Sequence, residues 1–318
     1  MKRRTLITAT TATTATAAVL TTGAGTAQAA PHTTAARGRV RENLPMRSRT
    51  LGMDVLYSLY LPPGWNARRR HPYPVLYLLH GATGQNDEWL RMGNAREILD
   101  RAIARRRIPP LVVVMPDGRR DTSRPSAEQP LVYWMNDADG GFPWADMFTT
   151  EFLPYVEDRY RAGGAAERRG IGGLSMGGFG SLSFAMRAPG TFAAAIGLSV
   201  GLRTDAQHVA LDMAGYNWRF GAAFGRDLEG EARLNERYLH WNLFRVLERT
   251  PAAELSRTAY YLDCGSYDEF FEANADLHLA MTAKGLEHRF MAREGIHEWQ
   301  YWIDGLPGGL DFLAEHLG

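Results

Sequence analysis

The sequence has little cysteine, no excess of charge of either sign, and no long uninterrupted hydrophobic run. One cysteine in 318 residues, Cys264, excludes an internal disulfide and a cysteine-rich zinc site. Because 36 Lys and Arg residues face 35 Asp and Glu, no basic field favours nucleic acid as a partner. The apolar stretch at residues 6–20 is interrupted by threonines and falls short of the ~20 residues of a membrane span, so no stable membrane anchor is predicted.

The first thirty residues have the features of an export signal. A positive start, Lys2-Arg3-Arg4, precedes the weakly apolar stretch, and Ala27-Gln28-Ala29 supplies an A-x-A cleavage pattern. We therefore expect a signal peptide over residues 1–29 and a secreted mature protein. Residues 3–7 also resemble a twin-arginine signal, although Lys2 stands where a small polar residue is usual, so this route and the general secretory route both stay open.

Apolar segments alternate with helical patterns through the rest of the chain. Near-continuous apolar runs at residues 75–79 and 111–115 are typical of strands buried on both faces, and residues 95–106 between them have a helical pattern. The alternation continues to a C-terminal helix at 301–316. It predicts an α/β fold with a mostly parallel sheet and helices on both faces.

The remaining segments set the expected domain organisation. Residues 30–50 are polar and Arg-rich, which favours a flexible lead-in to one domain over residues 51–318. Residues 202–257 interrupt the alternation with many aromatic and charged side chains. This insertion is either ordinary helical packing or a cap over an active site that offers aromatic surface to a substrate.

A candidate nucleophile lies in the segment Gly173-Leu174-Ser175-Met176-Gly177, which fits the pattern G-x-S-x-G. A strand is predicted before it and a helix after it, as the pattern requires. On such a sharp turn the serine Oγ is raised above the edge of the sheet, whereas a plain Gly-rich connection is the alternative. The context favours Ser175 as a nucleophile.

A serine nucleophile needs a base and an acid. His297 follows the last predicted strand, 122 residues after Ser175, which suits the chain order serine, acid, histidine. The acid should follow the strand predicted at 259–263. Asp268 is favoured because a loop could turn its carboxylate towards His297, while Asp263 and Glu269 remain alternatives.

The oxyanion and the substrate need further groups. The backbone N–H of Met176 and that of Ala82, in the loop after residues 75–79, are the candidate oxyanion donors. Trp89, Trp134 and Trp299 are candidates for substrate contact, with loop packing as the alternative for each.

Several motifs together resemble the esterase D family, which includes S-formylglutathione hydrolases, feruloyl and acetylxylan esterases and mycolyltransferases. They are Tyr77-Leu78-Leu79-His80-Gly81, Asp87-Glu88-Trp89, residues 173–178, Gly265-Ser266-Tyr267-Asp268 and Gly295-Ile296-His297-Glu298-Trp299. The resemblance implies an α/β-hydrolase fold, a triad of Ser175, Asp268 and His297, oxyanion donors Ala82 and Met176, and no cofactor or catalytic metal. His80 departs from the mycolyltransferases, which typically have aspartate there.

These observations predict a secreted serine esterase that works through an acyl-enzyme. The expected substrate is a small-molecule or polysaccharide-linked ester, with an acyl, acetyl or feruloyl group on a carbohydrate. The alternative enzyme is an acyltransferase of the mycolyltransferase type, in which a sugar hydroxyl replaces water. A non-catalytic binding protein is a third hypothesis, which the presence of every expected triad residue disfavours.

Overall fold

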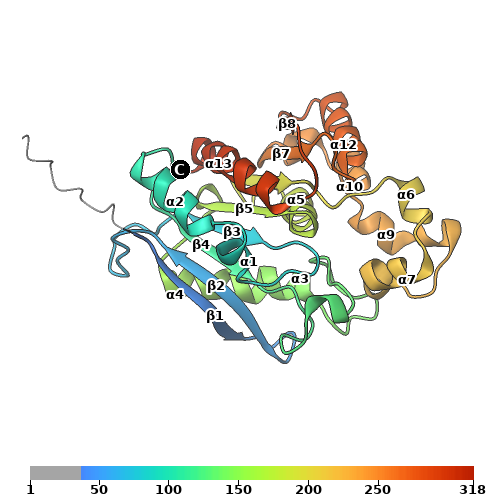
Figure 1. The fold of residues 1–318 in the computed structure, drawn as a ribbon, viewed down its shortest axis with the longest axis horizontal. Coiled ribbons are helices and arrows are strands. Elements are labelled where there is room, and N and C mark those ends of the chain that lie inside the picture. The colour runs from blue at the N-terminus through green and yellow to red at the C-terminus, as the bar shows by residue number, and fades with distance from the viewer. Residues whose placement is uncertain (1–36) are drawn as a thin grey trace, which may run out of the picture. The chain divides into compact units, whose positions relative to one another are not determined.

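The computed structural model describes residues 37–318, so the predicted export signal and the start of the predicted lead-in lie outside the described residues. Eight strands form one sheet in the order β1-β2-β4-β3-β5-β6-β7-β8 (Figure 1). Strands β3 to β8 are parallel to one another, whereas β2 is antiparallel to both its neighbours. The strands are β1 Arg39–Arg47, β2 Asp54–Leu61, β3 Val75–Leu79, β4 Val112–Pro116, β5 Arg169–Leu174, β6 Ala194–Leu198, β7 Ala259–Gly265 and β8 Arg289–Arg293.

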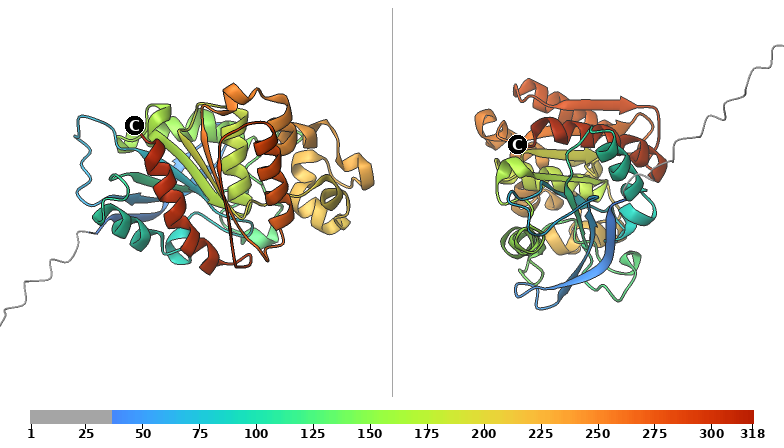
Figure 2. Two further views of the ribbon diagram at one scale, coloured as in Figure 1. Left: turned by 90° about the horizontal axis from the view of Figure 1, so that it is seen from above. Right: turned by 90° about the vertical axis from the view of Figure 1, so that its left-hand side faces the viewer.

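Helices cover both faces of the sheet. One face carries α2 and α13, and the other carries α3, α4, α5, α10 and α12, so the sheet lies between two apolar layers (Figure 2). The prediction of a mostly parallel sheet with helices on both faces is confirmed. These helices are α2 Ala95–Ala104, α3 Trp144–Met147, α4 Leu153–Tyr160, α5 Met176–Arg187, α10 Leu243–Arg249, α12 Phe271–Ala283 and α13 Trp299–His316; a short α1, Glu88–Arg91, precedes α2.

The N-terminal part of the folded region differs from the prediction. Residues 39–47, expected within a flexible lead-in, form edge strand β1, which pairs antiparallel with β2. In β1 only Met46 is buried, and the pairing register shifts between Arg41 and Leu44, next to the positive φ of Asn43. An edge strand that is largely exposed on both faces, with its register shifted midway, has no alternating apolar pattern, so its sequence gave no strand signal.

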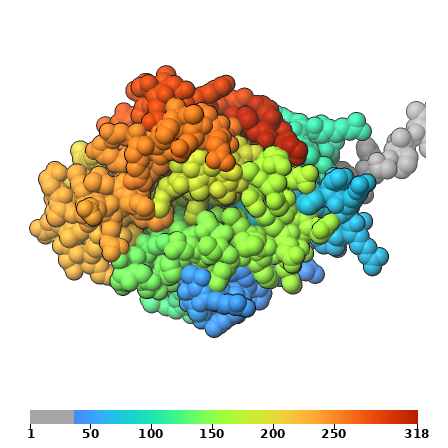
Figure 3. Space-filling view, turned by 180° about the vertical axis from the view of Figure 1, so that it is seen from behind, coloured from blue at the N-terminus to red at the C-terminus, as the bar shows by residue number. Residues whose placement is uncertain are grey.

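Apart from α10, most of the insertion at residues 202–257 forms short helices at one end of the sheet (Figure 1), and its yellow and orange atoms make up that end of the molecule in Figure 3. Most of its aromatic side chains pack together, with Tyr216, Phe220 and Tyr238 placed around the buried His208. The insertion is therefore mainly helical packing, although three of its residues reach the cavity described below. Besides α10, its helices are α6 Asp205–Val209, α7 Met213–Tyr216, α8 Ala222–Phe224, α9 Glu236–Trp241 and α11 Ala252–Leu255. No helix in residues 37–318 has the length and apolar character needed to cross a bilayer.

Candidate active site

Ser175 occupies the tight turn between β5 and α5. Its backbone has φ 52° and ψ −119°, in the left-handed half of conformational space that favours glycine. Such strain is kept only where surrounding contacts fix it. Here the Ser175 N–H donates to the Leu198 carbonyl at 2.8 Å, and the N–H of Gly201 donates to the Ser175 carbonyl at 2.8 Å. The turn lifts the side chain above the carboxyl edge of the sheet, as the G-x-S-x-G pattern predicted.

The two glycines of the motif allow three backbone segments to meet at this turn. A Cβ on Gly173 would lie 2.5 Å from the Gly177 carbonyl carbon. A Cβ on Gly177 would overlap the Leu79 carbonyl oxygen and lie 2.6 Å from that of His80. The start of α5 therefore rests directly on the end of β3, which brings the loop after β3 beside Ser175.

Replacing Gly177 with alanine should destabilise the protein by about 3 kcal/mol or more, because the added methyl group meets rigid backbone rather than a movable side chain. Chemical denaturation monitored by circular dichroism measures the loss. The control is Ser183→Ala, since Ser183 is also buried in α5 but its hydroxyl has no partner among the described residues. Equal stability of Gly177→Ala and wild type would contradict the close approach of α5 to β3.

His297 and Asp268 extend a line of contacts from Ser175. The His297 Nε2 lies 3.0 Å from the Ser175 Oγ, and its Nδ1 lies 2.8 Å from the Asp268 Oδ2. With the proton of a neutral imidazole on Nδ1, where Asp268 accepts it, the Nε2 lone pair faces the serine hydroxyl. The imidazole is held edge-on between Phe270 and Trp302, at ring-centroid distances of 5.0 and 4.9 Å.

The Asp268 carboxylate is buried but well supported. Burial alone would raise its pKa, but the hydrogen bond and the charge of His297, with the N–H of Phe270 at 2.9 Å, hold the pKa below its usual value. The carboxylate therefore stays ionised and can stabilise a positive charge on His297.

The structure distinguishes among the three carboxylates that the sequence offered as the acid of the triad. Only Asp268 among them is hydrogen-bonded to His297. Asp263 lies inside β7, where it pairs with Arg293 at 3.0 Å and accepts a hydrogen bond from Tyr301. Glu269 is exposed at the rim of the cavity. Because β7 continues to Gly265, the strand ends two residues later than predicted and Asp263 faces structural partners.

The loop after β3 passes close to Ser175 and lines the same cavity through Gly81, Ala82 and Thr83. A Cβ on Gly81 would lie 3.5 Å from the Ser175 Cβ. Met176 is the first residue of α5, so its N–H is one of those that a helix leaves without an internal partner. The two predicted oxyanion donors, Ala82 and Met176, thus belong to segments that adjoin Ser175.

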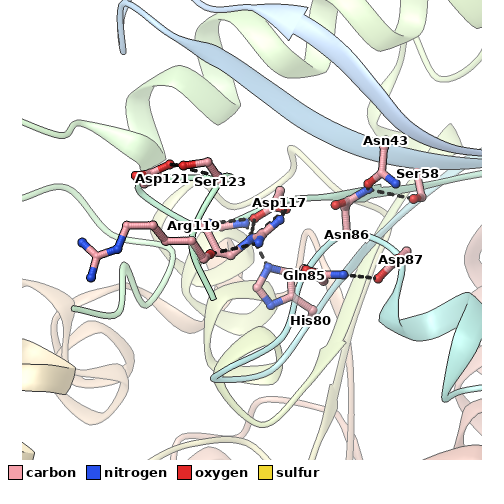
Figure 4. A network of polar contacts seen from close by, with 12 residues as sticks. Asn43, Ser58, His80, Gln85, Asn86, Asp87, Asp117, Arg119, Asp121 and Ser123 are labelled. Atoms are coloured by element: carbon pink, nitrogen blue, oxygen red, sulfur yellow. Dashed lines mark hydrogen bonds and ion pairs between the residues drawn. The ribbon is translucent and has the colours of Figure 1, made fainter. Parts of the chain in front are cut away.

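His80 holds the loop after β3 in place through two hydrogen bonds. The Gly118 N–H donates to its Nε2 at 2.9 Å, so Nδ1 carries the proton and donates to the Gly81 carbonyl at 2.7 Å. Burial lowers the pKa of His80, which keeps the imidazole neutral as this pattern needs. Figure 4 shows it within a polar network that includes the Asp117–Arg119 ion pair and Asn86. Sequence reasoning placed His80 in a family motif without assigning it this supporting role.

The cavity above Ser175 has a volume of about 470 Å³. Trp299 lines it, as predicted, but Trp89 and Trp134 do not. Each of these two is 1% exposed: Trp89 donates to the Leu79 carbonyl, and Trp134 packs between His80 and Trp144. Their predicted substrate contact is therefore wrong, because both rings build the core that supports the loops. Sequence reasoning missed other lining residues, namely Glu88, Leu131, Arg203, Arg219, Phe270 and Trp302.

Glu88 also lines the cavity, and burial, with the nearby charges of Asp87 and Asp117, raises its pKa to about 7. A folded-state pKa above that of the unfolded chain means that this carboxyl costs stability as pH rises from about 4.5 through 7. Glu88→Gln should therefore be more stable than wild type at pH 8 and nearly equal to it at pH 4. Thermal unfolding across this range measures the difference. A constant difference at all pH values would contradict the raised pKa.

Other concave or polar regions offer no comparable chemistry. A larger hollow of about 750 Å³ lies at the amino ends of β6 and β7, away from Ser175, and has no serine–histidine pair at hydrogen-bonding distance. Among residues 37–318, no three His, Cys, Asp or Glu side chains gather as metal ligands would.

Comparisons with known proteins show which family the chain resembles. A family model described as "Esterase" matches residues 48–313. An esterase of Mycobacterium tuberculosis is 28% identical over 58% of this chain and 39% of its own, so the chain spans about two fifths of that relative. An acetyl esterase of Caldicellulosiruptor saccharolyticus is 22% identical over 76% of this chain and 83% of its own.

Solved structures show the same fold. A ferulic acid esterase superimposes with a TM-score of 0.74 and 27% identity, covering 89% of this chain and 99% of its own. An S-formylglutathione hydrolase from Agrobacterium tumefaciens superimposes with a TM-score of 0.67 and 20% identity, covering 90% of this chain and 98% of its own. The predicted α/β-hydrolase fold is confirmed.

Proposed function

The chain belongs to the esterase family, and from this premise we propose that it is a serine esterase that hydrolyses carboxylic esters through an acyl-enzyme. The observation that carries the proposal is the unbroken line of contacts from Ser175 through His297 to Asp268, with distances of 3.0 and 2.8 Å. The hydrogen bonds orient a base towards a hydroxyl that is otherwise a weak nucleophile.

The proposed reaction has two halves. Ser175 Oγ attacks the ester carbonyl while His297 Nε2 takes the hydroxyl proton, and the N–H groups of Ala82 and Met176 hold the oxyanion. His297 then gives the proton to the leaving alcohol, and an acyl group remains on Ser175. In the second half His297 takes a proton from water, the hydroxide oxygen bonds to the acyl carbon, and the acid leaves as the proton returns to Ser175.

We propose acyl, acetyl or feruloyl esters of carbohydrates as the substrates, whether small or attached to a polysaccharide. Similar proteins with the names acetyl esterase and ferulic acid esterase support this class. The aromatic rings of Trp218 and Trp299 in the wall of the cavity offer faces on which a sugar or an aromatic acyl group could pack.

We also propose that the protein is exported through the signal at residues 1–29. Sequencing the amino terminus of the protein recovered from the medium would test this proposal. A chain that still begins at residue 1 would contradict it.

The proposed reaction is tested by incubating the purified protein with 4-nitrophenyl acetate, butyrate and decanoate and with methyl ferulate, with and without a sugar acceptor. We expect free acid from at least one ester in both conditions. If an acylated sugar replaces the free acid, the protein is an acyltransferase and hydrolysis is a side reaction. If every ester stays intact and no sugar is acylated, the proposed activity is wrong.

A further inference from the structure

Two arginines enter the cavity above Ser175 without an acidic partner. Arg203 and Arg219 are half-buried and line the cavity, and neither forms an ion pair with a carboxylate within residues 37–318. Four other arginines of the described chain do have such partners, in the pairs Arg119–Asp117, Arg120–Asp137, Arg169–Glu157 and Arg293–Asp263. The buried Arg233 and the half-buried Arg187 have none, but backbone carbonyls accept hydrogen bonds from Arg233, and Arg187 stacks on Trp241. A charge removed from water without a partner is costly, so an anionic ligand in the cavity would stabilise Arg203 and Arg219.

Arg203 is the more unusual of the two. Its Nη1 is fully enclosed and has no hydrogen-bond partner among the described residues. Its guanidinium lies over the Phe270 ring at 4.8 Å, and the other neighbour of that ring is His297. A single aromatic ring thus separates an unpaired guanidinium from the proposed catalytic base. A buried N–H group without an acceptor is unfavourable, and an acceptor that reached it would remove this cost.

The backbone holds Arg203 in this place. Two residues earlier, the Gly201 N–H donates to the Ser175 carbonyl and the Gly201 carbonyl accepts from Tyr133 at 3.0 Å. The segment after β6 is thus tied to the nucleophile turn. Arg219 is held more loosely, by a 3.3 Å bond to the Gly215 carbonyl and by stacking on Trp218.

The acidic groups of the cavity do not neutralise these arginines. Glu269 and Glu298 are exposed at its rim, where water screens their charge. Glu88 also lines the cavity, and its carboxyl lies beside Gly84 of the loop after β3. Arg203 and Arg219 therefore line the space that a substrate would fill, without a carboxylate partner among the described residues.

From this arrangement we propose that the substrate of this site carries a carboxylate, held by Arg203 with support from Arg219. The inference rests on the proposed function and narrows its substrate class to acidic esters. A planar guanidinium matches a carboxylate through two parallel N–H···O bonds, and it remains charged at any relevant pH. The carboxylate belongs either to the acid released by the reaction or to the alcohol, such as an acidic sugar.

Binding to the Ser175→Ala protein tests this inference without requiring turnover. The acid side is probed with monomethyl adipate against methyl hexanoate, and the alcohol side with 4-acetoxybenzoate against 4-acetoxybenzamide. Ligand titrations followed by NMR give each Kd. We expect at least one charged ester to bind about tenfold or more tightly than its neutral counterpart, the effect of one charge-assisted contact. The pair that shows the preference identifies which part of the substrate carries the carboxylate.

Three arginine variants, made in the Ser175→Ala protein, show which arginine causes the preference for charged esters. Arg203→Gln should remove it, and Arg203→Lys should keep part of it, because lysine keeps the charge but loses the bidentate geometry. Arg226→Gln is the matched control, since it removes the same charge from an exposed position in the same insertion. Equal binding of charged and neutral esters, or an equal loss in the Arg203→Gln and Arg226→Gln proteins, would overturn the inference.

Turnover of the same four esters by the protein with Ser175 intact keeps the two proposals apart. If the charged ester binds preferentially but none is cleaved, the proposed activity fails while the carboxylate site stands. If all four are cleaved with no preference for charge, the esterase stands and the carboxylate site is wrong.

Discussion

Replacing Ser175 with alanine should lower kcat for ester hydrolysis by about a millionfold, the loss seen when the nucleophile of a serine triad is removed. The reason is chemical, because alanine has no oxygen to form the acyl-enzyme, and His297 and Asp268 then have no hydroxyl to activate. Initial rates on the best ester of the panel measure the effect, with thermal unfolding as the test of an intact fold.

The control for this change is Ser183→Ala, which removes a buried hydroxyl from the same helix without touching the cavity. It should leave kcat within about twofold of wild type, as a change without a catalytic role would. A Ser175→Ala protein that keeps more than about a tenth of the wild-type rate would show that another group is the nucleophile.

Asp268→Asn should lower kcat by about ten-thousandfold while leaving the fold intact. An asparagine amide in this position donates to His297 Nδ1, so the imidazole proton moves to Nε2 and the base no longer faces Ser175 with a lone pair.

The lowered pKa of Asp268 leads to a second expectation, on the pH dependence of activity. Since the carboxylate remains ionised in mild acid, its protonation should not limit activity there.

Asp263→Asn is the comparison that distinguishes the two aspartates. Asp263 is 1% exposed and pairs with Arg293, so losing its charge leaves a poorly compensated cation and should cost about 3 kcal/mol of stability. The folded fraction should keep a kcat near that of wild type. If Asp263→Asn were stable but inactive and Asp268→Asn were active, Asp263 would be the acid of the triad.

The sequence alone identified the residues that depend on chain order and on local pattern. Ser175 could be identified because a strand, a Gly-rich turn and a helix are all local features, and His297 because it follows the last strand. The choice among three acidic residues needed the structure, since one or two residues of strand length decide which carboxylate faces the histidine. β7 ends at Gly265, which puts Asp268 in the loop.

The walls of the cavity were harder to predict. Trp89 belongs to a motif and Trp134 does not, but a position in the sequence does not show which way a ring points, and both rings are buried in the core. Arg203 and Trp218 lie in an insertion without a recognisable pattern, so only the fold brings them to Ser175. Edge strand β1 was missed because its exposed residues alternate too weakly to give a period.

The central claim is that His297 activates Ser175, and covalent labelling tests it most directly. The purified protein is treated with a fluorophosphonate, and the modified residue is located by mass spectrometry of its peptides. The account predicts one adduct, on Ser175, which Ser175→Ala abolishes and His297→Ala slows severely, because the hydroxyl then has no base. An unlabelled wild-type protein, an adduct elsewhere, or unchanged labelling of His297→Ala would contradict it.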